Sequence, residues 1–250
     1  MTEHDDRGDA GPSSTEETDG PRSLPSAGPP AGKHKHMPFW QELFLLLGLA
    51  LVLAVGIKAL VMQAFYIPSG SMNDTLVFND RILVQKISYW GEADPERGDV
   101  VVFADPGGWL SGEEVPRPRN VAVQGLEWVG LFPTGGHLVK RVIAVGGDTV
   151  QCCDRKGRVR VNGTPLAEGS YLAPGEEPSL VTFKQVVPEG YLWVMGDNRS
   201  QSADSRAHLG DPGGGFVPVE DVVGKVFAVV WPIDNSKLLR RPGAYEAVGR

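Results

Sequence analysis

The chain has 250 residues, enough for one sizeable domain with additional segments. Its formal net charge of −7 argues against non-specific nucleic-acid binding, which needs a basic surface, and we expect no nucleic-acid partner. Its 32 glycines and 20 prolines favour turns and short strands over a helical bundle.

Residues 1–36 contain many Pro, Gly, Ser and Thr residues and more acidic than basic side chains, and they hold no apolar run. Such a segment cannot bury enough apolar surface to offset its ordering entropy. We therefore expect residues 1–36 to form a disordered tail.

The next segment is strongly apolar. Leu43–Met62 is interrupted by one charge, Lys58, and as a helix it would be about 30 Å long, which matches a bilayer core. A cleaved signal peptide would need a small-x-small site, which the positions before Ala59 and Ala64 do not provide. A buried core helix would be amphipathic, whereas this segment is apolar on all sides. The sequence therefore predicts one transmembrane helix over residues 40–62.

Basic residues flank this helix on one side only. Lys33 and Lys35 precede it, and no Lys or Arg follows its end until Arg81. The positive-inside rule predicts a single-pass protein of the cell membrane with a cytoplasmic tail and an extracytoplasmic domain over 63–250.

The remainder alternates β-rich segments with Gly/Pro-rich ones, which predicts a mostly β, antiparallel domain. The predicted strands are 81–89, 99–103, 138–145, 148–152, 158–161, 191–195 and 222–231. Asn162-Gly163 predicts a two-residue hairpin. Residues 104–136 and 202–220 are expected to be long loops.

The two cysteines, Cys152 and Cys153, are adjacent, and no Cys/His spacing of the zinc type occurs, so we expect no metal and no cofactor. Because neighbouring residues on a strand point to opposite faces, two unpaired thiols are slightly favoured over a disulfide.

Three segments carry residues suited to catalysis. FYIPSGSM places Ser69 and Ser71 in one turn, and a serine nucleophile needs a base nearby. His137 and His208 are alternatives outside the tail, but His137 is interpreted as a solvated loop residue. Lys140 lies in mid-strand on the face of Leu138 and Val142, where desolvation lowers the pKa of a lysine. A solvated edge-strand lysine is the simpler alternative.

The third segment, GDNRSQSADSR, spans residues 196–206. Such a polar cluster usually forms a solvated turn, but it can also form a hydrogen-bonded network that holds a site. In that case Ser202 could hold the lysine amine, and Asp204 could pair with Arg206.

FYIPSGSM, GDVVVF, LVKRVIAVGGD and GDNRSQSADSR occur in this order after an apolar span, and this arrangement resembles the bacterial type I signal peptidases. The Gly/Trp-rich loop and the Cys-Cys pair are similar to those of actinobacterial members. The resemblance implies a membrane-anchored serine endopeptidase that cleaves N-terminal signal peptides from secreted preproteins, with preproteins and the lipid bilayer as partners.

The resemblance also implies roles for individual residues. Ser71 would be the nucleophile and Lys140 the general base, with Ser69 and the Ser71 N–H forming the oxyanion hole. Ser202 would orient the lysine, and Asp204 with Arg206 would support the site. The positions that match the substrate pocket are Ile67, Pro68, Met72, Leu76 and Val139.

One departure from the family pattern is Asp74, which stands where the family usually has proline. Two other functions are conceivable. A non-catalytic β domain could bind a partner through Trp109, Trp128 and Phe132 of the 104–136 loop. A self-cleaving repressor would need a DNA-binding domain in place of the acidic tail, and we set it aside.

Overall fold

The computed structural model describes residues 38–89, 91, 93–110 and 136–249. The predicted tail over 1–36 and most of the predicted 104–136 loop, with Trp128 and Phe132, lie outside these residues. By its internal contacts the chain divides into two units, Met1–Leu45 and Leu46–Arg250.

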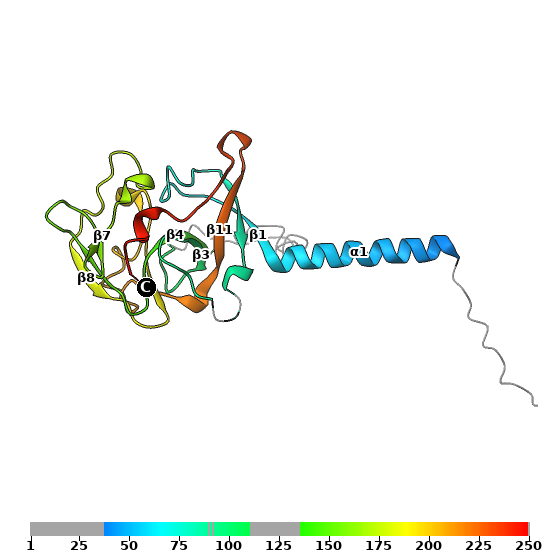
Figure 1. The fold of residues 1–250 in the computed structure, drawn as a ribbon, viewed down its shortest axis with the longest axis horizontal. Coiled ribbons are helices and arrows are strands. Elements are labelled where there is room, and N and C mark those ends of the chain that lie inside the picture. Colours follow the sequence, from blue (N-terminus) through cyan, green and yellow to red (C-terminus); the bar gives the residue numbers. More distant parts are fainter. Residues whose placement is uncertain (1–37, 90, 92, 111–135, 250) are drawn as a thin grey trace, which may run out of the picture. The chain divides into compact units, whose positions relative to one another are not determined.

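One long α-helix, α1, spans Phe39–Val61 (Figure 1). Pro38 precedes it, and the Pro38 carbonyl accepts hydrogen bonds from the N–H groups of Gln41 and Glu42. Leu and Ala dominate the helix, and both are strong helix formers. By length and composition, the window Phe39–Gly56 is the one stretch of the described chain able to cross a membrane, with a mean hydropathy of 2.0.

The larger sheet has eight strands in the order β1-β2-β11-β3-β4-β9-β10, with β12 paired to β11 (Figure 1). All of its pairings are antiparallel. Its strands are β1 Met62–Tyr66, β2 Arg81–Gln85, β3 Val100–Ala104, β4 His137–Val145, β9 Tyr191–Met195, β10 Val217–Pro218, β11 Val222–Trp231 and β12 Lys237–Leu238.

A second sheet has four antiparallel strands in the order β7-β6-β5-β8. These are β5 Thr149–Cys152, β6 Arg160–Val161, β7 Thr164–Pro165 and β8 Phe183–Val186. Asn162 and Gly163 connect β6 to β7 with φ of 50° and 80°, as a type I′ turn requires. The predicted hairpin is therefore confirmed.

Short 3₁₀ helices complete the fold, at Ile87–Tyr89, Glu168–Ser170, Arg199–Gln201, Val219–Asp221, Ile233–Asn235 and Gly243–Tyr245. The mostly β, antiparallel prediction is confirmed, and most predicted strands match to within two residues. The prediction at 81–89 was too long, because the strand ends at Gln85 and a 3₁₀ turn follows. β1 was missed because its apolar residues continue the composition of the preceding helix.

The cysteine prediction was wrong. Cys152 and Cys153 form a disulfide across a cis peptide bond. β5 ends at Cys152, so the alternation of side chains along a strand, on which the prediction depended, does not extend to Cys153. Cys152 is buried in an apolar cluster that includes Val150, Phe183 and Trp193.

Asp148, in the turn between β4 and β5, ties several segments together. It accepts hydrogen bonds from Arg97 Nε at 2.7 Å, from Arg97 Nη2 at 2.6 Å and from Asn162 Nδ2 at 2.7 Å. The N–H of Val145 also donates to it at 2.9 Å. Burial acts to raise the pKa of Asp148, but these hydrogen bonds, led by those from Arg97, outweigh it and lower the pKa.

This lowered pKa predicts a pH-dependent stability. A carboxylate with a depressed folded pKa contributes stability that is fully present above its unfolded pKa, about 4, and that is lost as pH falls through the folded pKa. We expect the melting temperature of wild type to exceed that of Asp148→Asn at neutral pH, and the gap to shrink in acid. Circular dichroism melts of both proteins between about pH 7 and pH 2 measure this. A gap that stays constant over that range would contradict the role of Asp148.

Candidate active site

A tight turn after β1 presents Ser69 and Ser71. The Asn73 N–H donates to the Gly70 carbonyl at 3.0 Å, and the Leu76 N–H donates to the Met72 carbonyl at 2.7 Å. Met72 and Leu76 are 1% and 0% exposed, so their side chains anchor the turn in the core. This anchoring fixes the position of the serines between them and β1.

Lys140 meets Ser71 from β4. Its Nζ lies 2.8 Å from Ser71 Oγ, and the two residues are 4% and 6% exposed. β4 pairs with β3 on one side and with β9 on the other, so Lys140 is not on an edge strand. Leu138 and Val142, which we expected on the same face, belong to one buried apolar cluster.

Ser69 lies beside the nucleophile candidate, and its Oγ is 3.3 Å from Ser71 Oγ. The Ser71 N–H donates to no residue that the structure describes. The hydroxyl of Ser69 and this N–H are therefore two donors close to Ser71 Oγ.

The positions predicted for the substrate pocket gather around this turn. Ile67, Met72 and Leu76 are buried in one apolar cluster, and Val139 packs against it. Pro68 is exposed beside Ser69. The structure thus brings these positions together next to Ser71.

A buried ion pair that sequence analysis missed lies behind the turn. Arg141 Nε and Nη2 donate to the two carboxylate oxygens of Asp197 at 2.8 and 2.6 Å. Asp197 also accepts from the Thr75 hydroxyl at 2.6 Å, which links the pair to the serine turn. Burial acts to lower the pKa of Arg141, but the facing Asp197 carboxylate raises it overall. The sequence could not predict Asp197 as the partner of Arg141, because 56 residues separate the two along the chain.

Asp204 and Arg206 form the pair expected for them. Arg206 Nε and Nη2 donate to the Asp204 carboxylate at 2.9 and 2.8 Å, and the Gly196 N–H donates to it at 3.0 Å. Ser202 differs from its expectation. Its Oγ is buried and makes no hydrogen bond with any residue that the structure describes, so the predicted bond to Lys140 is not formed.

Ser202 nevertheless lies close to the turn that carries Ser71. A Cβ added at Gly196 would come within 2.3 Å of Ser202 Oγ and 2.4 Å of the Ser71 carbonyl oxygen. Gly196 is thus packed directly between Ser202 and the backbone of Ser71, and Ser202 misses the lysine although it is near the site.

His137 and His208, the two histidines of the unit Leu46–Arg250, make contacts away from the Ser71–Lys140 pair. His137 is not the solvated loop residue that we expected: it is the first residue of β4, partly buried, with its ring edge-on to Phe65. The two Gly residues before it suggested a loop, but the strand begins one residue earlier than predicted. His208 stacks on Trp109 at 4.3 Å, and its Nδ1 lies 2.7 Å from Asp211. Among the described residues no group of three or more His, Cys, Asp or Glu is arranged to hold a metal ion.

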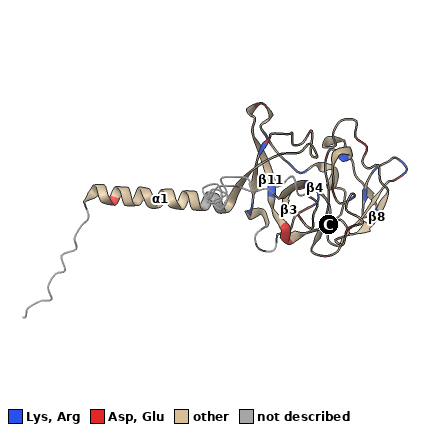
Figure 2. Ribbon diagram, turned by 180° about the vertical axis from the view of Figure 1, so that it is seen from behind, with Lys and Arg blue, Asp and Glu red and all other residues tan. Residues whose placement is uncertain are grey.

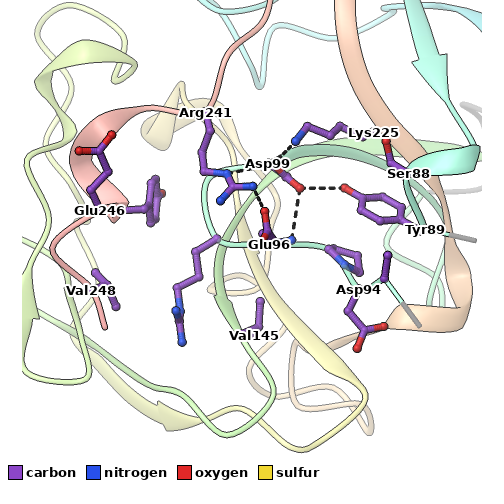
Figure 3. A pocket seen from close by; sticks show the side chains of 14 residues that line it. Ser88, Tyr89, Asp94, Glu96, Asp99, Val145, Lys225, Arg241, Glu246 and Val248 are labelled. Atoms are coloured by element: carbon purple, nitrogen blue, oxygen red, sulfur yellow. Dashed lines mark hydrogen bonds and ion pairs between the residues drawn. The ribbon is translucent and has the colours of Figure 1, made fainter. Parts of the chain in front are cut away.

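A cavity of about 860 Å³ lies at another place (Figure 3). Asp99 is at its centre and binds Lys225 Nζ at 2.6 Å and the Tyr89 hydroxyl at 3.1 Å. None of the residues predicted for catalysis or for the substrate pocket lines it. Because Asp99 at its centre is already paired with Lys225 and the cavity is separate from the Ser71–Lys140 contact, we do not assign catalysis to it.

Comparison with known proteins supplies an independent observation. Residues 40–231 match the family model described as signal peptidase, peptidase S26. The chain is 42% identical to the signal peptidase I of Mycobacterium tuberculosis, over 80% of this chain and 75% of that protein. It is 34% identical to the signal peptidase I of Leptolyngbya laminosa, over 92% and 98% of the two chains. The crystal structure of a signal peptidase I from Enterococcus faecalis matches 54% of this chain and 98% of that one, at 25% identity and a TM-score of 0.34.

The turn geometry explains Asp74 and yields a prediction. Asp74 has φ of 80°, in the left-handed region that Asp tolerates and that proline, fixed near −65°, cannot enter. We expect Asp74→Pro to destabilise the protein by more than about 1 kcal/mol, whereas Asp74→Gly should stay within about 1 kcal/mol of wild type. Denaturant unfolding of the three proteins measures both. Equal stability of wild type and Asp74→Pro would show that the turn has another conformation.

Proposed function

Because the chain belongs to the signal peptidase family, peptidase S26, we propose that Ser71 and Lys140 are the nucleophile and general base of its cleavage reaction. The chain is a type I signal peptidase, a serine endopeptidase that removes signal peptides from preproteins. The observation that carries the residue assignment is the 2.8 Å contact between Lys140 Nζ and Ser71 Oγ in a buried setting.

The proposed reaction begins with proton transfer from Ser71 Oγ to the neutral amine of Lys140. Oγ attacks the scissile carbonyl carbon, and the resulting oxyanion accepts hydrogen bonds from the Ser71 N–H and the Ser69 hydroxyl. The protonated lysine then gives its proton to the leaving amine, which releases the mature protein. A water molecule, deprotonated by the same amine, then attacks the acyl carbonyl carbon. The ester bond to Ser71 Oγ breaks, the lysine returns the proton to Oγ, and the signal peptide leaves with a new carboxylate.

The surrounding residues have supporting roles in this proposal. Asp204 and Arg206 hold the segment that carries Ser202, and Ser202 would have to move from its present position to meet the lysine amine. The substrate would pair as an extended strand, and its small side chains would contact Pro68 and Val139. The buried side chains of Ile67, Met72 and Leu76 pack behind this position.

The lipid bilayer is the second proposed partner. α1 is long and apolar enough to cross a membrane. Glu42, in its first turn, is the charged residue that Figure 2 shows on the helix. The hairpin formed by β11 and β12 exposes several apolar side chains, which supports contact of this hairpin with lipid. These are Val230, Trp231, Ile233 and Leu238, exposed by 42%, 51%, 70% and 69%. We propose that residues 1–36 are cytoplasmic and that residues 63–250 form the extracytoplasmic catalytic domain.

The dyad assignment predicts that Ser71→Ala and Lys140→Ala each lower turnover by roughly 10³-fold or more, and that the double variant is no worse, because nucleophile and base act as a unit. The assay is cleavage of a preprotein with an Ala-x-Ala site by purified full-length protein. The His137→Ala/His208→Ala variant is the matched control and should keep nearly wild-type turnover. Loss of activity in that control, with Lys140→Ala still active, would reject the lysine as base.

The membrane proposal predicts the location of each end of the chain. A reporter that is active only outside the cytoplasm, fused after Arg250, should be active, and a protease added to intact spheroplasts should spare residues 1–36. The fusion should also resist alkaline extraction from membranes, because α1 spans the bilayer. A C-terminal reporter that works only in the cytoplasm would reverse the proposed orientation, and extraction at high pH would argue against a span.

A further inference from the structure

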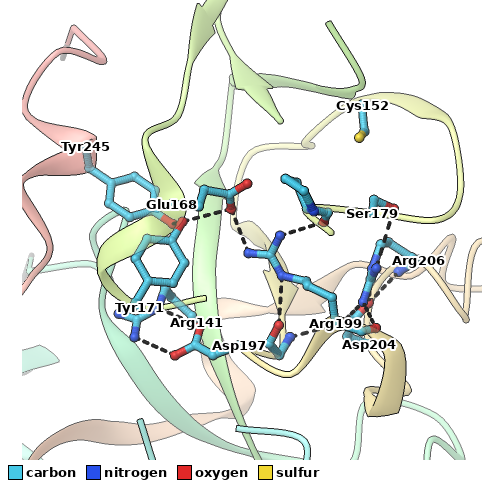
Figure 4. Close-up of polar contacts among 12 residues, drawn as sticks. Arg141, Cys152, Glu168, Tyr171, Ser179, Asp197, Arg199, Asp204, Arg206 and Tyr245 are labelled. Atoms are coloured by element: carbon cyan, nitrogen blue, oxygen red, sulfur yellow. Dashed lines mark hydrogen bonds and ion pairs between the residues drawn. The ribbon is translucent and has the colours of Figure 1, made fainter. Parts of the chain in front are cut away.

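Arg141 is held on its edges and also on its face. Its edges donate to Asp197, to the Gly98 carbonyl at 2.8 Å and to the Thr75 hydroxyl at 3.4 Å. Its face is covered by the ring of Tyr171, whose centroid lies 4.4 Å from the guanidinium carbon (Figure 4). A cation over an aromatic face is attracted by the ring quadrupole, more strongly when both are buried. The ring therefore restricts movement of Arg141 out of the guanidinium plane on the side of Tyr171, a direction that its in-plane hydrogen bonds do not control.

Hydrogen bonds hold Tyr171 in turn. Its hydroxyl donates to Glu168 Oε1 at 2.9 Å, and that oxygen also accepts from Arg199 Nη2 at 2.6 Å. The Tyr245 hydroxyl lies 2.9 Å from the Tyr171 hydroxyl. Because a hydroxyl has one proton and that of Tyr171 goes to Glu168, Tyr245 is the donor to Tyr171. Burial raises the pKa of Tyr171 well above its ordinary value, so it stays a donor at neutral pH.

Tyr245 comes from the end of the chain and reaches Arg141 by a second route. Its ring packs on Gly98, where an added Cβ would lie 2.7 Å from Tyr245 Cδ2. The Gly98 carbonyl is an acceptor of Arg141, and the Gly98 N–H donates to the Val142 carbonyl at 2.7 Å. Tyr245 thus helps to hold two groups that contact Arg141: the ring of Tyr171 and the carbonyl of Gly98.

We propose that Tyr171 and Tyr245 are positioning residues for the Ser71–Lys140 dyad. They touch neither reacting atom and act through Arg141. This residue forms the ion pair with Asp197, donates to the Thr75 hydroxyl and follows Lys140 directly on β4. This role rests on the proposed function. It makes the C-terminal segment around Tyr245, which lies beyond the family match over residues 40–231, a part of the catalytic architecture.

A purely structural role is the alternative, because both tyrosines belong to a buried cluster and are 4% and 5% exposed. The two roles differ in what a substitution changes. Loss of core packing lowers the stability, whereas loss of positioning lowers kcat in protein that is still folded. A misplacement of about 1 Å in a catalytic group can cost about a hundredfold in rate.

The first test compares Tyr171→Leu with Tyr171→Phe in full-length protein, with preprotein cleavage measured well below the melting temperature of each variant. Tyr171→Leu removes the ring over Arg141, and we expect kcat to fall roughly ten- to a hundredfold with KM little changed. Tyr171→Phe keeps the ring and should restore most of kcat. Phe183→Leu is the matched control: it removes a buried ring from the same cluster, one that contacts Trp193, and should keep kcat near wild type.

The second test uses Tyr245 variants. If Tyr171→Leu does not fold, these variants alone test the positioning role. Tyr245→Ala should lower kcat, and Tyr245→Phe, which keeps the ring on Gly98, should restore most of it. Folded Tyr171→Leu or Tyr245→Ala with kcat near wild type would overturn the positioning role, as would an equal fall in Phe183→Leu. Ser71→Ala and Lys140→Ala in the same assay separate the two proposals. Failure of the dyad assignment would appear as near-wild-type turnover in those two variants, whereas failure of the positioning role would appear only in the tyrosine variants.

Discussion

The buried ion pair between Arg141 and Asp197 is the constraint on which the site depends. The two side chains are 3% and 0% exposed, so neither charge has water to replace a lost partner. Removing one member of such a pair typically costs about 3–5 kcal/mol, because the other charge stays buried and uncompensated. The pair therefore holds only if β4, the segment after β9 and the turn at Thr75 keep their relative positions. The need to keep both buried charges paired therefore also fixes the geometry of the turn that carries Ser71 and Thr75.

β4 links this constraint to the proposed dyad because neighbouring residues on a strand point to opposite faces. Arg141 reaches Asp197 from one face, and Lys140 reaches Ser71 from the other. Pairing with β3 and β9 keeps the strand from sliding, since a shift by one residue would exchange the two side chains. The same strand thus places Arg141, which stays charged, in an ion pair, and it places Lys140, whose amine can gain or lose a proton, beside the Ser71 hydroxyl.

The sequence predicted those parts of the structure that have a local signature. Apolar composition identified α1, β-branched runs identified the long strands, and Asn162-Gly163 identified a hairpin, because each depends on neighbouring residues. Glu168, Tyr171 and Tyr245 have no such signature: a buried Glu and a surface Glu look alike in sequence, and Tyr245 meets Tyr171 across 74 residues. The position of Ser202 also depended on packing, since the motif placed it near the site but not where its hydroxyl points.

Gly196 connects the surrounding hydrogen-bond networks to the turn of Ser71, the proposed nucleophile, without any contact to its hydroxyl. Its carbonyl accepts from Arg199 Nε at 2.8 Å, and its N–H donates to Asp204. Two charged side chains thus fix one peptide segment from both sides, and neither contacts Ser71 Oγ. The Cα of Gly196 faces the Ser71 carbonyl so closely that a methyl group would lie 2.4 Å from its oxygen. The close packing of Gly196 therefore lets the buried ion pairs hold the backbone of Ser71 in place, while its hydroxyl stays in contact with Lys140.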